Sequence, residues 1–485
     1  MSSSGANWIH GTDHNPILDL AKETATLTFH PDNDSKIVYD ERGYLLDEKK
    51  ASEHGDAVWG IIGDAFKYSA QESASIPQGL SLMDYFRSSL EEKKLGDESS
   101  ALILQMARIW GDFVGDPIEK QSLKYLWLEE CIDGGMYIVE NRLLYQLTST
   151  ENLFVASTYK TILNRIAEPV LSKAQLRLSS KVVKVSTNTN VGSDHATSVA
   201  VSINTEEAPI LYDEIVVAVP LGYLRRNLDS FSPPLPNHLA KAISHITYGR
   251  LEKVYITFPA AFWHDESSAT ESTSFFTQFL HPTYATEQNP DGWNIEAASL
   301  ALLPGESAHP TLLFYMHGPC AEHVTSLING LDPASSKYYN RLQRFFEPYY
   351  SRLRNYDASS ADCIPKAVLA TNWQNDEFAG YGSYTNCQIS HGEEQISLDK
   401  DIETLRYGAP ERHLWFAGEH TAPFVALGTV TGAYWSGEAV AKRILHAYGM
   451  LDDAGTETEV GVEDSSQGQD GEVKGTGHGA GVVAL

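Results

Sequence analysis

The sequence has few of the features that assign a protein to a class at once. Its four cysteines are scattered without a CxxC pair, so they indicate neither a zinc site nor a disulfide framework. No apolar run reaches the roughly 18 residues that span a bilayer, and the first residues, MSSSGANWIHG, lack the basic and apolar regions of a signal peptide. We therefore expect no metal, no membrane and a reducing, cytoplasmic compartment.

Basic residues are also scarce. The chain has 36 Lys and Arg against 64 Asp and Glu, a formal net charge of -28. A nucleic-acid partner is excluded on this ground, because binding phosphates requires a basic surface. The charge suits a small cationic substrate, although an acidic surface that serves solubility alone would look the same.

A third absence is the GxGxxG motif, the glycine turn that holds a dinucleotide pyrophosphate between a strand and a helix. The length of 485 residues leaves room for two or three domains. Helical patterns predominate in residues 31–150, and short β-branched runs typical of strands occupy 175–187, 198–204 and 211–220. The sequence therefore predicts a mixed α/β protein.

The clearest local pattern lies in residues 414–443. An apolar strand at 414–417 is followed by a glycine turn, a polar loop that contains Glu419, and a helix that starts near Thr429. A helix start in this position offers N–H groups to an anion or an electron-rich ring. Small residues would let a flat group approach the backbone: Gly428, Gly432, Ala433 and Gly437. The alternative is a strand–helix unit that is tightly packed and binds nothing.

Lys253 is the second unusual position, because it interrupts the apolar strand pattern LEKVYITF. A buried lysine without a partner is costly, so such a position needs a functional reason. The alternative is an edge strand from which Lys253 points into solvent.

Three segments in the same chain order resemble motifs of the flavin amine oxidases, the family of polyamine oxidases, monoamine oxidases and flavin-dependent histone demethylases. They are GANWIHG at 5–11, the Lys253 strand, and FAGEHT followed by GTVTGAYWSG. The resemblance implies an α/β (mixed α+β), two-domain FAD-binding architecture that lacks the N-terminal GxGxxG unit. The expected domains are an incomplete FAD-binding domain at 1–30, 151–242 and 370–448 and a mixed-sheet and helical substrate domain at 31–150 and 243–369. An acidic, Gly/Ser-rich tail at 449–485 is expected to be disordered.

The resemblance also assigns roles to single residues. Lys253 would hold a water at the flavin N5, and His10 would lie beside the substrate amine, which makes both catalytic. The remaining expected residues bind either cofactor or substrate: Val182, Trp373, Glu419, Thr429 and Val430 for FAD, and Trp8, His10 and Tyr384 for the amine. No metal ligand is expected.

The implied activity is FAD-dependent oxidation of a polyamine (spermine, spermidine or an acetylated form) at a C–N bond. Oxygen would be the acceptor, and an aldehyde, an amine and H2O2 the products. GANWIHG favours the polyamine oxidases within the family. Because the pyrophosphate turn is missing, we expect poor FAD binding, and the alternative is a catalytically silent or truncated homologue that acts as a scaffold or binding protein. The polyamine, the bond cleaved and the oligomeric state remain open.

Overall fold

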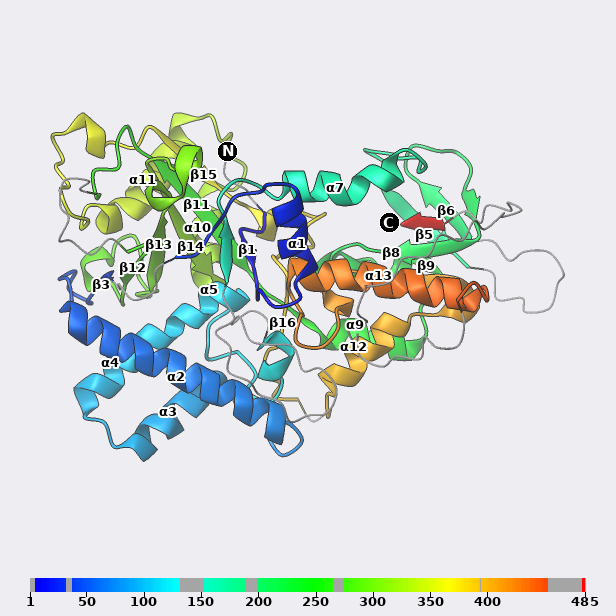
Figure 1. Cartoon of the computed structure of the whole chain (residues 1–485), viewed down its shortest axis with the longest axis horizontal. Helices are drawn as coiled ribbons and strands as arrows, with labels where there is room; N and C mark the ends of the chain where they lie inside the picture. The colour runs from blue at the N-terminus through cyan, green and yellow to red at the C-terminus, as the bar shows by residue number, and fades with distance from the viewer. Residues whose placement is uncertain are drawn as a thin grey trace.

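The computed structural model describes residues 5–31, 37–130, 152–187, 199–264, 274–392, 394–451 and 482–484. Helices and sheets are mixed throughout these residues (Figure 1), which confirms the predicted α/β class. Cys131, the end of the predicted helical stretch and most of the predicted tail lie outside them. None of the described helices is long and apolar enough to cross a membrane.

A six-stranded sheet forms the centre of one half of the molecule, at the upper left of Figure 1. Its order is β15 (Ala367–Ala370), β11 (Leu251–Thr257), β14 (Thr311–His317), β13 (Ile295–Ser299), β12 (Phe276–Phe279) and β3 (Ile37–Tyr39). β11 is an interior strand, since it pairs with both β14 and β15. The prediction of a strand around Lys253 is confirmed, and the alternative of a solvent-facing edge strand is not what the structure shows.

Alternation along these strands separates two environments. Val254, Ile256, Phe314 and Ala297 belong to a core that also contains residues of α10 (Gly318–Ile328) and α11 (Ser336–Tyr350). The intervening residues, Lys253, Tyr315 and Glu296, point to the opposite face and line a cavity. Each of these strands therefore contributes side chains both to the apolar core and to the cavity.

A helical layer borders the same cavity. It consists of α2 (Glu48–Glu72), α3 (Leu82–Lys93), α4 (Asp97–Ala107) and α5 (Gly111–Val114), which share an apolar core around the fully buried Trp110. Ser81 and Asp84 form a reciprocal cap that fixes the start of α3. α2 begins at Glu48, where Asp47 caps its first turn by accepting a hydrogen bond from the N–H of Lys50.

The other half combines smaller sheets with helices (Figure 1). In one sheet β8 (Glu214–Val217) lies between β17 (Leu414–Phe416) and β18 (Val482–Ala484), and a second has the order β7 (Ile210–Tyr212), β6 (Val199–Ile203), β5 (Val182–Ser186) and β9 (Phe231–Ser232). A third has the order β1 (Trp8–Ile9), β4 (Leu153–Val155) and β2 (Thr28–Phe29). β10 (Thr247–Tyr248) pairs with β16 (Thr385–Asn386). Its helices are α1 (Pro16–Glu23), α7 (Lys160–Leu171), α8 (Leu221–Arg226), α9 (Asn237–His245), α12 (Leu398–Tyr407) and α13 (Val430–Ala447).

The predicted strand–turn–helix unit is present as β17 and α13. The Thr429 side chain accepts a hydrogen bond from the Gly432 N–H at 2.9 Å, which caps α13 where the sequence predicts its start. Val482–Ala484, within the stretch predicted to be a disordered tail, form β18 and pair in parallel with β8. A β-branched segment beside the open edge of a strand accounts for this pairing.

Two of the glycines predicted to admit a flat ligand, Gly432 and Gly437 of α13, do not line the cavity. At Gly432 a Cβ would lie 2.1 Å from the Ala426 carbonyl oxygen and 2.7 Å from the Ala422 Cβ, so this glycine admits the chain's own loop. At Gly437 a Cβ would meet nothing within 4 Å.

These two glycines provide a matched pair for a stability test. We expect Gly432→Ala to lower the free energy of unfolding by about 1–3 kcal/mol, because the loop must move away from the helix. Gly437→Ala should instead raise it by up to about 1 kcal/mol through helix propensity. Thermal melting of both variants checks this, and equal melting temperatures would show that the loop does not pack on α13.

Candidate active site

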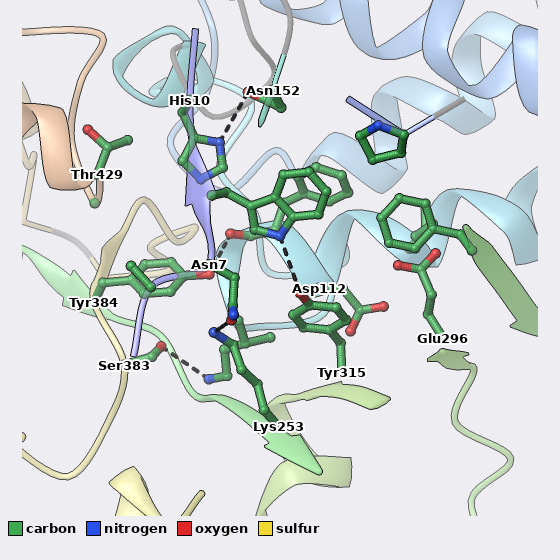
Figure 2. Close-up of a pocket in the computed structure, with 18 of the residues that line it drawn as sticks. Asn7, His10, Asp112, Asn152, Lys253, Glu296, Tyr315, Ser383, Tyr384 and Thr429 are labelled. Carbon is green, nitrogen blue, oxygen red and sulfur yellow. Dashed lines mark hydrogen bonds between the residues drawn. The ribbon is translucent and has the colours of Figure 1, made fainter. Parts of the chain in front are cut away.

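Segments far apart in the sequence meet around one cavity of about 940 Å³. Its walls come from the N-terminal segment, α2, α5, the six-stranded sheet, the loop before β16 and the start of α13. Figure 2 shows the Thr429 and Tyr384 side of the cavity at one end of the view and Asp112 and Glu296 at the other, with Lys253 and Tyr315 between them.

The Lys253 side chain lines this cavity and is almost completely buried. The residue is 7% exposed, and Nζ donates to the Gly5 carbonyl oxygen at 2.5 Å and to Asn7 Oδ1. Burial lowers the pKa of Lys253 to about 7, while the neighbouring Glu252 carboxylate acts in the opposite direction. Near neutral pH this amine can therefore both hold and release a proton.

Glu252 faces away from the cavity and positions a neighbouring segment. It accepts hydrogen bonds from Thr371 Oγ1 at 2.5 Å and from the Gln374 N–H at 2.9 Å. These bonds hold the short turn that carries Trp373 beside β11. Alternation along one strand thus gives Lys253 a place in the cavity and Glu252 a structural task.

The N-terminal segment is held against the sheet by its polar groups. Trp8 Nε1 donates to the Tyr315 hydroxyl at 3.2 Å, and the Trp8 carbonyl accepts from the Tyr159 hydroxyl at 2.5 Å. The His10 ring lies 3.3 Å from Asn152 Oδ1 through Nδ1. Trp8 and His10 therefore line the cavity from a fixed strand rather than from a free end of the chain.

The start of α13 closes the side of the cavity opposite Glu296. Thr429, Val430 and Ala433 line it there, and Thr431 Oγ1 donates to Asn15 Oδ1 at 3.1 Å. The first N–H groups of a helix have no acceptor within the helix, and the helix dipole favours negative charge beside them. This wall therefore suits a group on which negative charge develops.

Glu419 adds an incompletely satisfied carboxylate to the same wall. Its Oε1 accepts from the N–H and the hydroxyl of Thr385, at 3.1 and 2.9 Å. Its Oε2 is buried and has no hydrogen-bond partner among the described residues. Burial raises the pKa of Glu419 to about 7. A buried oxygen of this kind calls for a donor from a ligand.

The segment before β16 places two aromatic side chains in the cavity wall. Trp373 and Tyr384 both line the cavity, and the Tyr384 hydroxyl donates to the Phe113 carbonyl oxygen at 2.6 Å. This bond connects the loop to α5 across the cavity. This bond fixes the orientation of the Tyr384 ring.

All but one of the residues expected from the sequence line this cavity: Trp8, His10, Lys253, Trp373, Tyr384, Glu419, Thr429 and Val430. Val182 does not. It lies on β5 and packs beside the core of the smaller sheet. Sequence reasoning did not single out Asn7, Asp112, Glu296 or Tyr315. Glu296 carries the same signal as Lys253, a charge inside the apolar run WNIEAASL, whereas the other three depend on tertiary contacts.

The described residues contain no group of His, Cys, Asp and Glu side chains that could hold a metal ion. The cavity instead combines one amine, a helix N-terminus, buried carboxylates and aromatic rings. This combination suits a flat organic group next to a cationic ligand.

Comparison with known proteins agrees with this chemistry. The chain is 23% identical over 452 residues to "Probable polyamine oxidase 4" of Arabidopsis thaliana, a match that covers 90% of this chain and 76% of that relative. It is 27% identical over 233 residues to the human "Peroxisomal N(1)-acetyl-spermine/spermidine oxidase", which covers 48% of this chain and 42% of the relative.

A solved putrescine oxidase variant with redesigned cofactor binding superposes with a TM-score of 0.61 at 14% identity, over 92% of this chain and 88% of that one, so the two share a fold. The family model described as flavin containing amine oxidoreductase matches residues 2–445, which is nearly the whole chain. On this evidence, the chain belongs to the flavin-containing amine oxidoreductases.

Proposed function

We propose that this protein oxidises a polyamine or a related small cationic amine at a C–N bond, with O2 as the electron acceptor and with water that hydrolyses the resulting imine, releasing an aldehyde, an amine and H2O2. The observation that carries the proposal is the buried Lys253 amine, which faces the same cavity as the start of α13 and Glu419. The named relatives that act on polyamines support the substrate class, as does the net charge of -28.

FAD is the cofactor that family membership implies. The described residues fit its flavin end: the unpartnered Glu419 Oε2 calls for a donor, and Gly428, at φ 75°, and Ala433 leave the backbone of the cavity wall open to a flat ring. Thr429 and Val430 would hold that ring at the start of α13. This sequence contains no GxGxxG turn for the phosphate end.

When bound, FAD supplies the acceptor for hydride from the carbon next to the amine nitrogen and passes the electrons to O2. The chain's own residues orient the amine and manage protons. Lys253 Nζ, with a pKa of about 7, would hold a water or exchange a proton beside the reacting carbon. His10 would hydrogen-bond the substrate nitrogen, and the rings of Trp8 and Tyr384 would confine the alkyl chain.

A second candidate, a catalytically silent scaffold or binding protein, is favoured by one observation, the absence of the pyrophosphate turn. The two candidates differ in what an amine does to bound flavin. An oxidase would lose its visible flavin absorbance when the amine is added without oxygen, whereas a silent homologue would bind the amine and keep its colour.

Lys253→Met tests the proposed role of the amine. The substitution keeps the aliphatic stem and removes the nitrogen, so we expect flavin reduction or reoxidation to slow by at least about tenfold, about 1.4 kcal/mol of barrier, with little loss of folded protein. Stopped-flow measurement of both half-reactions on the FAD-saturated chain checks this. Unchanged rates in both would remove Lys253 from the site.

The same variant should also alter the pH profile. The neutral fraction of Lys253 rises as the pH passes upward through about 7, so a step in which Nζ accepts a proton should accelerate across that range. Lys253→Met should lack this rise, because methionine does not titrate.

His10→Ala should affect substrate choice more than flavin chemistry. The imidazole would orient one nitrogen of the amine, so its loss should alter the dependence of KM on pH and on polyamine length. Steady-state kinetics with putrescine, spermidine and spermine check this. An unaltered pH profile and an unaltered preference among the three amines would show that His10 is only a packed loop residue after β1.

A further inference from the structure

The floor of the cavity is a single row of register partners across five strands. Lys253 on β11 pairs with Tyr315 on β14, Tyr315 with Glu296 on β13, Glu296 with Gln278 on β12, and Gln278 with Val38 on β3. All five line the cavity. Neighbouring strands lie about 4.8 Å apart, so the backbones of Lys253 and Glu296 are roughly 10 Å from each other.

Two buried carboxylates, Glu296 in the middle of this row and Asp112 of α5, lie on the side of the cavity away from Lys253. Glu296 is 5% exposed and its Oε2 accepts from Gln278 Nε2 at 3.2 Å. The Asp112 side chain, at the start of α5, is 8% exposed and its Oδ1 lies 2.8 Å from His317 Nδ1. Neither carboxylate forms an ion pair with a lysine or arginine within the part of the chain that the structure describes.

Not all polar atoms around Glu296 have a hydrogen-bond partner among the described residues. Gln278 Oε1 is buried without a hydrogen-bond partner among the described residues. Burial raises the pKa of Glu296 well above its usual range, and the nearby charge of Asp112 raises it further. A bound cation would offset the repulsion between the two carboxylates. If that cation is an ammonium group, the Gln278 amide oxygen can accept a hydrogen bond from it.

We propose that Asp112, Glu296 and Gln278 form a binding site for the distal ammonium group of a diamine or polyamine whose other nitrogen lies near Lys253. This inference rests on the proposed amine oxidase function and narrows it to substrates with a second cationic nitrogen. The spacing along the row selects an extended aliphatic chain that spans two strands.

The walls between the two ends suit such a chain. Trp59, Phe113 and Phe276 line the cavity with aromatic surface, and the Tyr315 ring lies between Lys253 and Glu296 in the row. Methylene groups pack on these rings, and an ammonium beside a ring face gains a further electrostatic attraction. A monoamine would place no ammonium group beside the two carboxylates.

The test compares spermidine with butylamine, a monoamine, on the full chain saturated with FAD. Glu296→Gln keeps the shape of the side chain and removes its charge, and Glu306→Gln removes the same charge from an exposed position. We expect Glu296→Gln to raise the KM for spermidine by about tenfold or more, and equally its Kd from isothermal titration of the chain with already reduced FAD. For butylamine both constants should change by less than about twofold. Glu306→Gln should change neither amine.

An equal loss for both amines, or no loss for spermidine, would overturn the proposal. If the parent chain oxidises neither amine but the titration still shows the loss that is selective for spermidine, the proposed oxidase function fails and the ammonium site stands. If Glu296→Gln does not fold, Asp112→Asn takes its place, because the asparagine oxygen can still accept from His317. Asp112→Asn must then show the same selective loss, and its absence contradicts the site.

Discussion

The register of the antiparallel strands β11, β14 and β13 is the constraint on which the candidate site depends. Side chains alternate across these strands, so Val254, Phe314 and Ala297 enter the core under α10 and α11, and their neighbours enter the cavity. A slip of one residue would exchange the two sets. Such a slip would bury Lys253 in the apolar core and turn core side chains into the cavity. The core and the cavity therefore both favour the observed register.

Long-range hydrogen bonds join the other walls to this sheet. Lys253 Nζ binds Gly5 and Asn7 of the N-terminal segment, and Thr431 of α13 binds Asn15 just after it. The Lys253 amine, the N-terminal segment and the start of α13 are therefore positioned by one another. Enclosure by these segments is also what lowers the pKa of Lys253 to about 7, so packing and proposed chemistry have the same origin.

Local patterns in the sequence predicted those parts of the fold that local physics decides. The strand and helix of residues 414–443 and the strand around Lys253 follow from apolar periodicity and from the cap at Thr429. Tertiary placement decided the rest. Gly432 looked like an opening for a ligand, but its missing Cβ leaves room for the Ala426 carbonyl. Asp112 comes close enough to raise the pKa of Glu296 because α5 packs against β14, the strand beside β13, although the two residues are 184 positions apart. Such contacts leave no local signal, and the pairing of β18 with β8 is equally non-local.

The central claim is that one cavity holds a flavin ring and an amine close enough to react. The visible spectrum of the FAD-saturated chain, recorded without oxygen before and after spermidine is added, tests it most directly. We predict that the absorbance of oxidised flavin disappears and returns, with release of H2O2, when oxygen is admitted. A spectrum that spermidine leaves unchanged, although titration shows that both FAD and spermidine are bound, would contradict it.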